Sequence, residues 1–68
     1  MIKNDTELKV TLERIERLQL QIAEIRKTET NPDNYRASVS GFVTEIDRLQ
    51  LEVREYLMSY PEPASTAS

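Results

Sequence analysis

Apolar residues recur every seven positions along two stretches of the chain, in two series per stretch that are offset by three residues. In the first stretch the series are Leu8, Ile15, Ile22 and Thr11, Leu18, Ile25. In the second stretch they are Val39, Ile46, Val53, Tyr60 and Tyr35, Phe42, Leu49, Tyr56. This is the a/d heptad pattern of a coiled coil, whereas a strand would alternate every second residue. The pattern therefore predicts two helices, each with one apolar seam.

Helix-start signals precede both stretches. Asn4 is a suitable N-cap, and Glu7, three residues later, completes the spacing of a capping box. Asn31 is a second N-cap, and Pro32 follows it at the first helical position, where the missing N–H of proline costs nothing.

The helix-stop signal is a pair of prolines, Pro61 and Pro63, which cannot continue a helix. We therefore place the helices at 5–28 and 32–60, in one hairpin domain spanning 1–60. The remaining residues, 61–68, are polar and have no apolar group to bury, so we expect a disordered tail.

The short connection makes the two helices antiparallel neighbours, so their seams can be aligned. Pairing residues whose numbers add up to 60 or 61 gives the layers Ile25/Tyr35, Ile22/Val39, Leu18/Phe42, Ile15/Ile46, Thr11/Leu49 and Leu8/Val53. Only the layer at Thr11 has a polar member. Tyr56 and Tyr60 extend past the first helix, where they can meet Ile2. The predicted fold is an all-α antiparallel two-helix hairpin.

Seven apolar residues lie outside this seam and need another explanation. They are Val10, Leu12, Leu20, Val43, Leu51, Leu57 and Met58. Exposed together on two helices they would be a liability unless they form an interface. Dimerisation into a four-helix bundle is the simplest solution, a different protein on the same face is the second, and a monomer is the third. We expect the partner interface to comprise Leu12, Leu20, Val43, Leu51, Leu57 and Met58.

Composition strengthens the case for a partner. A chain of 68 residues rarely builds a sufficient core alone, and with no Cys and no His it has neither disulfides nor the usual zinc ligands. The net charge of −3 argues against a nucleic-acid partner. Because no apolar run is long enough to span a membrane and no signal core is present, we expect a cytoplasmic protein without a membrane partner.

Two carboxylate pairs have a spacing that is found in metal sites. Glu13/Glu16 and Glu52/Glu55 both have the E-x-x-E spacing with which all-α nucleotide pyrophosphohydrolases hold Mg²⁺. Their heptad positions put the two pairs on faces that do not converge within one hairpin. We therefore expect solvated acids in local ion pairs, no metal, no cofactor and no enzymatic activity.

Gly41, the single glycine, lies in a weakly helical stretch of the second helix. It could mark a kink, a close approach of another helix, or a tolerated exposed position. A glycine in a helix interior costs about 1 kcal/mol relative to alanine.

Three segments carry a family resemblance: 1–4, 29–35 and 45–57. Together they resemble small cyanobacterial proteins of about this length. More distantly, they are similar to the helical hairpin that precedes the DNA-binding domain in HigA-type antitoxins. The resemblance implies a protein-binding module that neutralises a toxin through its helical face, and it supplies no catalytic residue. Because no helix-turn-helix domain follows here, operator binding is not implied.

The expected function is thus a non-enzymatic protein–protein interaction module, antitoxin-like or an adaptor, that associates with itself and, in the antitoxin-like case, with a second protein such as a toxin. The alternative is a purely structural homo-oligomeric helical bundle.

Overall fold

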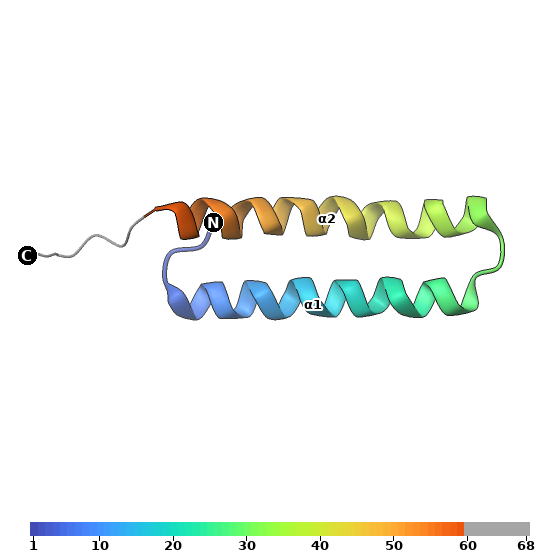
Figure 1. Ribbon diagram of the computed structural model, residues 1–68, viewed down its shortest axis with the longest axis horizontal. Coiled ribbons are helices and arrows are strands. Elements are labelled where there is room, and N and C mark those ends of the chain that lie inside the picture. Colours follow the sequence, from blue (N-terminus) through green and yellow to red (C-terminus); the bar gives the residue numbers. More distant parts are fainter. Residues whose placement is uncertain (60–68) are drawn as a thin grey trace, which may run out of the picture.

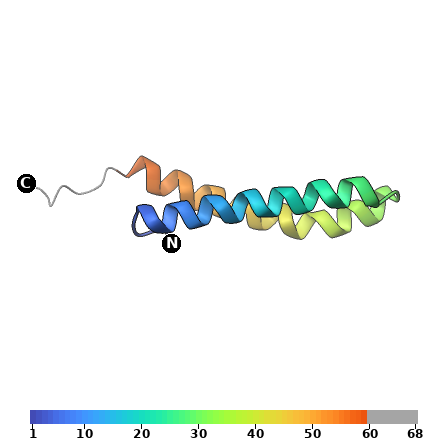
Figure 2. The same ribbon diagram turned by 90° about the horizontal axis from the view of Figure 1, so that it is seen from below.

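The computed structural model describes residues 1–59 and consists of two long helices packed side by side (Figure 1). Helix α1 spans Asp5–Thr28 and helix α2 spans Pro32–Met58. The chain reverses between them through the connection 29–31, so the helices are antiparallel, and they cross at a shallow angle (Figure 2). The predicted all-α hairpin is confirmed.

The start of α1 shows the predicted cap with one difference. The side-chain oxygen of Asn4 accepts a hydrogen bond from the Glu7 N–H at 2.8 Å, as expected of an N-cap. The Glu7 carboxylate, however, accepts from the N–H of Lys3 at 2.8 Å, one residue before the cap. The reciprocal bond of a capping box is therefore displaced by one residue. It ties the preceding segment to the helix.

The turn between the helices is held by the second cap. Asn31 accepts from the N–H groups of Asp33 at 2.9 Å and Asn34 at 3.3 Å, and Pro32 occupies the first helical position. At the end of α1 the N–H of Glu29 still donates to the carbonyl of Ile25 at 2.8 Å. Both helices thus have capping partners at the turn, which permits a connection of three residues.

Helix α2 ends two residues before the predicted end. Ser59 has extended backbone angles, φ −83° and ψ 116°, so Met58 is the last helical residue. The prolines indicated where the helix must already have stopped, but not how many residues earlier the last turn would open. The expectations for Tyr60 and for the tail at 61–68 lie outside the described residues.

The predicted seam is the packed face of the hairpin. Every seam residue in the described range is buried or half-buried, and the buried ones are Ile15, Val39, Ile46, Leu49 and Val53. Hydrogen bonds between the two helices at both ends agree with the predicted register. Arg26 donates to the Tyr35 hydroxyl, and the Tyr56 hydroxyl donates to Asp5. In each of these pairs the residue numbers add up to 61.

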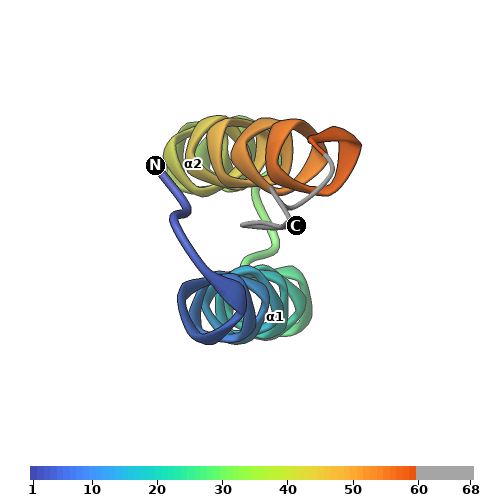
Figure 3. The same cartoon turned by 90° about the vertical axis from the view of Figure 1, so that its left-hand side faces the viewer.

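The core is thickest at the open end of the hairpin because the segment before α1 folds back onto it. Figure 3 shows this segment passing from α1 to one side of α2. It places Ile2, only 8% exposed, in one cluster with Ile15, Ile46, Leu49 and Val53. Tyr56 packs against the same cluster, so the expected meeting of Ile2 with the open-end tyrosine is confirmed for Tyr56.

The polar layer at Thr11 explains why Ile2 fits there. Thr11 is shorter than the other seam residues and faces Leu49 in the predicted register, which leaves apolar volume to be filled. Ile2 and Thr11 line the same hollow, and Leu49 is the most buried residue, at 6% exposure. The Thr11 hydroxyl is satisfied locally, since it donates to the Glu7 carbonyl at 2.8 Å.

Gly41 lies within α2, and the helix continues through it without interruption. A Cβ added at Gly41 would have nothing within 4 Å. The alternative of a close helix approach is therefore wrong for contacts within this chain, and the position is an exposed glycine.

Candidate functional site

The apolar residues outside the seam are all exposed, as the heptad pattern predicts. Among the six expected interface residues, the exposed fraction ranges from 42% at Val43 to 78% at Met58. Val10, the seventh, is 59% exposed. Their arrangement on the surface decides whether they form one site.

Helical geometry separates these residues into two sets. Leu12, Val43 and Leu57 each follow a seam residue by four positions, and in an antiparallel pair such positions from both helices lie on the same side. Across the hairpin, opposite residues have numbers that add up to about 61, so Gln50 lies level with Leu12 and Gln19 with Val43. These five residues carry no formal charge, and we call the strip that they form the apolar flank. Asp5, which lies level with Leu57, is the charged residue at its open end.

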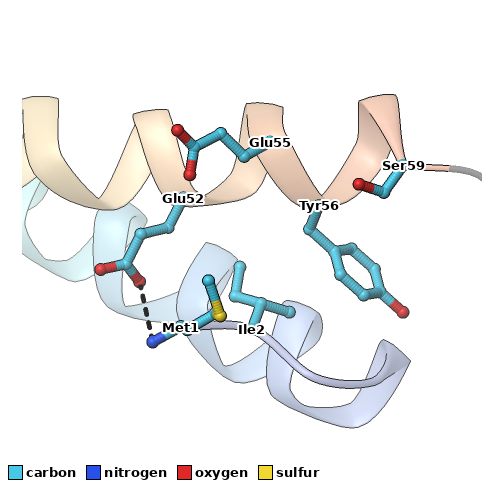
Figure 4. A pocket seen from close by; sticks show the side chains of 6 residues that line it. All are labelled: Met1, Ile2, Glu52, Glu55, Tyr56 and Ser59. Carbon is cyan, nitrogen blue, oxygen red and sulfur yellow. Dashed lines mark ion pairs between the residues drawn. The ribbon is translucent and has the colours of Figure 1, made fainter.

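The opposite side of the hairpin, the charged flank, is occupied by interactions within the chain. Arg14 of α1 lies 3.7 Å from Glu45 of α2, and Arg48 bridges Glu45 at 2.6 Å and Glu52 at 2.9 Å. The hydrogen bond to Glu45 and the charge of that carboxylate raise the pKa of the Arg48 guanidinium above its usual value. The segment before α1 also crosses this side, and its N-terminal ammonium lies 3.8 Å from Glu52 (Figures 3 and 4).

The two flanks therefore differ in kind. On the charged flank Arg14, Arg48, Glu45 and Glu52 are in ion pairs, and Ile2 covers the groove at the open end. The apolar flank between Leu12 and Leu57 has exposed side chains and no ion pair within the described part of the chain. Of the two, only the apolar flank resembles the uncovered side of a bundle helix pair.

The other three expected interface residues do not join this strip. Leu20, Leu51 and Met58 are at positions that face away from the neighbouring helix. Leu20 lines a shallow hollow of about 430 Å³ together with Ile25 and Phe42, on the side of the hairpin that carries the charged flank. The structure thus brings Leu12, Val43 and Leu57 to one side and leaves the remaining three on the outer faces.

The two glutamines of the apolar flank are not apparent from the apolar pattern of the sequence. Gln19 and Gln50 are polar, so a search for unused apolar residues passes over them. The signal that identifies them is their heptad position, because the positions equivalent to Leu12 are uncharged along the middle of both helices. An amide side chain is both a donor and an acceptor and can be buried in an interface when it is paired.

The carboxylate pairs are not gathered into a site. Glu13 and Glu16 are exposed on α1, while Glu52 is engaged by Arg48 and by the N-terminal ammonium. Within residues 1–59 no group of three or more His, Cys, Asp or Glu side chains is placed to hold a metal ion.

Two tyrosines join the helices by side-chain hydrogen bonds, one at each end of the hairpin. Near the turn, the Arg26 guanidinium donates to the Tyr35 hydroxyl at 3.2 Å and lies 5.7 Å from the ring centre. At the open end Tyr56 donates to the Asp5 carboxylate at 2.6 Å. This hydrogen bond, followed by desolvation and the charges of Asp5 and Glu7, raises the pKa of the Tyr56 hydroxyl above 10.0.

A second hollow, of about 360 Å³, opens beside Tyr56 (Figure 4). Its walls are Met1, Ile2, Glu52, Glu55, Tyr56 and Ser59. The Glu52 carboxylate in it is already paired with the N-terminal ammonium. The hollow is the remaining space between the folded-back segment and α2.

Neither described helix is apolar enough over a sufficient length to cross a bilayer. Comparison of the chain with protein-family models, with curated proteins and with solved structures finds no match.

Proposed function

We propose that this protein is a non-enzymatic protein-interaction module that binds a partner chain through the apolar flank. The observation that carries the proposal is the asymmetry of the hairpin. One side has Leu12, Val43 and Leu57 exposed, and the other side has ion pairs and a groove that is covered at the open end. When one side of a two-helix protein has exposed apolar side chains, a partner that covers that side adds most to its stability.

The size of the core supports the same proposal. Six hydrophobic side chains are buried in the described range, and even these keep 6–9% of their surface exposed. The chain has no Cys or His with which to add disulfides or common zinc sites. Burial of the apolar flank against another chain would therefore add to the stability of the hairpin.

The nature of the partner separates two forms of this function. A second copy of the chain makes the protein a homo-oligomeric helical bundle, which can be purely structural. A second protein such as a toxin makes it antitoxin-like or an adaptor. The proposal includes a cytoplasmic setting, since a chain without Cys needs no oxidising compartment. It includes no nucleic acid, because the net charge is −3.

The test compares two exposed valines that lie on opposite sides of the hairpin. Val43→Glu places a charge on the apolar flank, whereas Val10→Glu places one on the other side at a residue that is similarly exposed. Sedimentation velocity at micromolar concentrations measures self-association. Immobilised protein, incubated with an extract of the source cell, measures capture of a second protein. The binding measurement is then repeated with that second protein in purified form. We expect Val43→Glu to abolish the association and Val10→Glu to retain it.

The proposal fails if both variants behave alike. It also fails if the wild-type protein stays monomeric and the Val43→Glu variant captures every protein that the wild type captures. Circular dichroism of both variants serves as the control that the hairpin is still formed.

A further inference from the structure

We infer that the occupant of the apolar flank is a second copy of this chain, docked about a two-fold axis at the level of Leu12 and Gln50. The inference rests on the proposed function and names its partner and register. In this dimer α1 lies antiparallel to the partner's α1, and α2 lies antiparallel to the partner's α2. The spacing of the apolar residues favours this dimer.

Val43 and Leu57 lie seven residues on either side of Gln50, which is about 10.5 Å in each direction along α2. A two-fold axis at Gln50 therefore sets Val43 against the partner's Leu57, and Leu57 against the partner's Val43. On α1 the same axis sets Leu12 against its own copy. Gln50 also meets its copy, where two amides can exchange a donor and an acceptor. Each of the three exposed apolar side chains of the flank thus gains an apolar partner.

Charge supplies the second argument. Lys9 and Glu16 on α1, and Asp47 and Arg54 on α2, are exposed residues along the outer border of the apolar flank. Each pair is separated by seven residues and has opposite signs. Two turns of helix keep the members of a pair too far apart to interact within the chain. None of the four is in an ion pair in the part of the chain that the structure describes.

The proposed axis places each of these four charges beside a charge of opposite sign on the partner. It passes close to the midpoint between Lys9 and Glu16, and it sets Lys9 beside the partner's Glu16. On the other helix it sets Asp47 beside the partner's Arg54. Because the axis generates each contact twice, the dimer gains four ion pairs along the two edges of the interface. Charges at a rim give register and specificity more than affinity.

The other two-fold arrangement that brings the two flanks face to face with the helices aligned fits less well. An axis parallel to the helices sets Lys9 beside the partner's Arg54 and Glu16 beside the partner's Asp47, which are like charges. This axis sets α1 on the partner's α2. It also sets Leu57 beside the partner's Asp5 and Leu12 beside the partner's Gln50, so the exposed apolar residues gain no apolar partners. Only the antiparallel arrangement satisfies both the charges and the apolar residues.

The test is a charge swap on α2, where the residues three and four positions from Asp47 and from Arg54 are uncharged. Asp47→Arg and Arg54→Asp each create two like-charge contacts in the dimer. We expect each to raise the dissociation constant roughly tenfold at low salt, measured by sedimentation equilibrium. The double variant has the wild-type composition with the signs exchanged, and we expect its dissociation constant to return to within about threefold of the wild-type value.

The outcomes distinguish this inference from the proposed function. Single variants that dimerise more tightly than the wild type, with a double variant that is tighter still, overturn the register, because this is the result expected when α1 lies on the partner's α2. Single variants that dimerise like the wild type overturn it too. In both cases a dimer that Val43→Glu still dissociates leaves the proposed function standing. A wild-type protein that stays monomeric overturns the inference, and capture of a second protein by the apolar flank then decides the proposed function alone.

Discussion

Individual side chains define the ends of this hairpin. Asn4 and Asn31 cap the two helices, and Tyr35 and Tyr56 join them at the turn and at the open end. The caps were predictable, because an Asn before a heptad run has few other uses. The tyrosine contacts were not, since Arg26 and Asp5 become their partners only when the register of the two helices is set.

The Tyr56 hydrogen bond makes the stability of the folded protein depend on pH in the alkaline range. The pKa of Tyr56 is higher in the folded protein than in the unfolded chain, so its stabilising effect is fully present below pH 10 and is lost as pH rises through the raised pKa. We expect Tyr56→Phe to lower the thermal midpoint at neutral pH, and the difference from wild type to narrow above pH 10. Circular dichroism melting as a function of pH measures this.

The control for Tyr56→Phe is Tyr35→Phe, which removes a hydroxyl that accepts rather than donates its hydrogen bond. A difference between wild type and Tyr56→Phe that stays constant from neutral to strongly alkaline pH would show that the bond to Asp5 does not contribute as described.

At the scale of the elements, helix α1 has the predicted bounds and α2 begins at the predicted residue. Both starts rely on local chemistry, which a sequence shows directly. The end of α2 was predicted less well, because a downstream proline sets only a limit. Gly41 is the weakest position of α2 by intrinsic propensity, and its surroundings are open.

We expect Gly41→Ala to stabilise the hairpin by about 0.5–1 kcal/mol, because alanine restricts the unfolded chain and meets no neighbour here. The free energy of unfolding from urea titration at a fixed protein concentration measures this. Sedimentation is the control, since Gly41 is outside the apolar flank and the variant should associate like the wild type. Destabilisation would indicate that another chain packs closely against Gly41.

At the scale of the whole molecule, the two sides of the hairpin become different. The folded-back segment and the Arg14, Arg48 and Glu45 contacts cover one side, and the apolar flank stays open on the other. The expected interface of six residues is thereby reduced to Leu12, Val43 and Leu57, with Gln19 and Gln50 between them. Apolar character alone could not separate the three residues of the apolar flank from the other three, because it does not specify the side of the hairpin that a side chain faces.

The folded-back segment is itself a tertiary feature that can be tested through Ile2. We expect Ile2→Ala to lower the free energy of unfolding by about 2–4 kcal/mol, because Ile2 is buried in the hydrophobic core cluster with Ile15 and Leu49. Val10→Ala, a truncation at an exposed residue of the same end, should change it by less than about 0.5 kcal/mol. Equal effects of the two substitutions in urea unfolding would mean that Ile2 is not held in the core in solution.

The sequence by itself determined the helices, their caps at the turn, the seam and its register, because each follows from local chemistry or from a strict seven-residue period. The tertiary structure alone decided where Ile2 packs, which residues fasten the ends, and which side of the hairpin remains open. Those features depend on contacts between residues distant in the chain, and periodicity specifies such contacts only along the seam. Off the seam, the direction in which each side chain points relative to the second helix decides whether it is paired, covered or left for a partner.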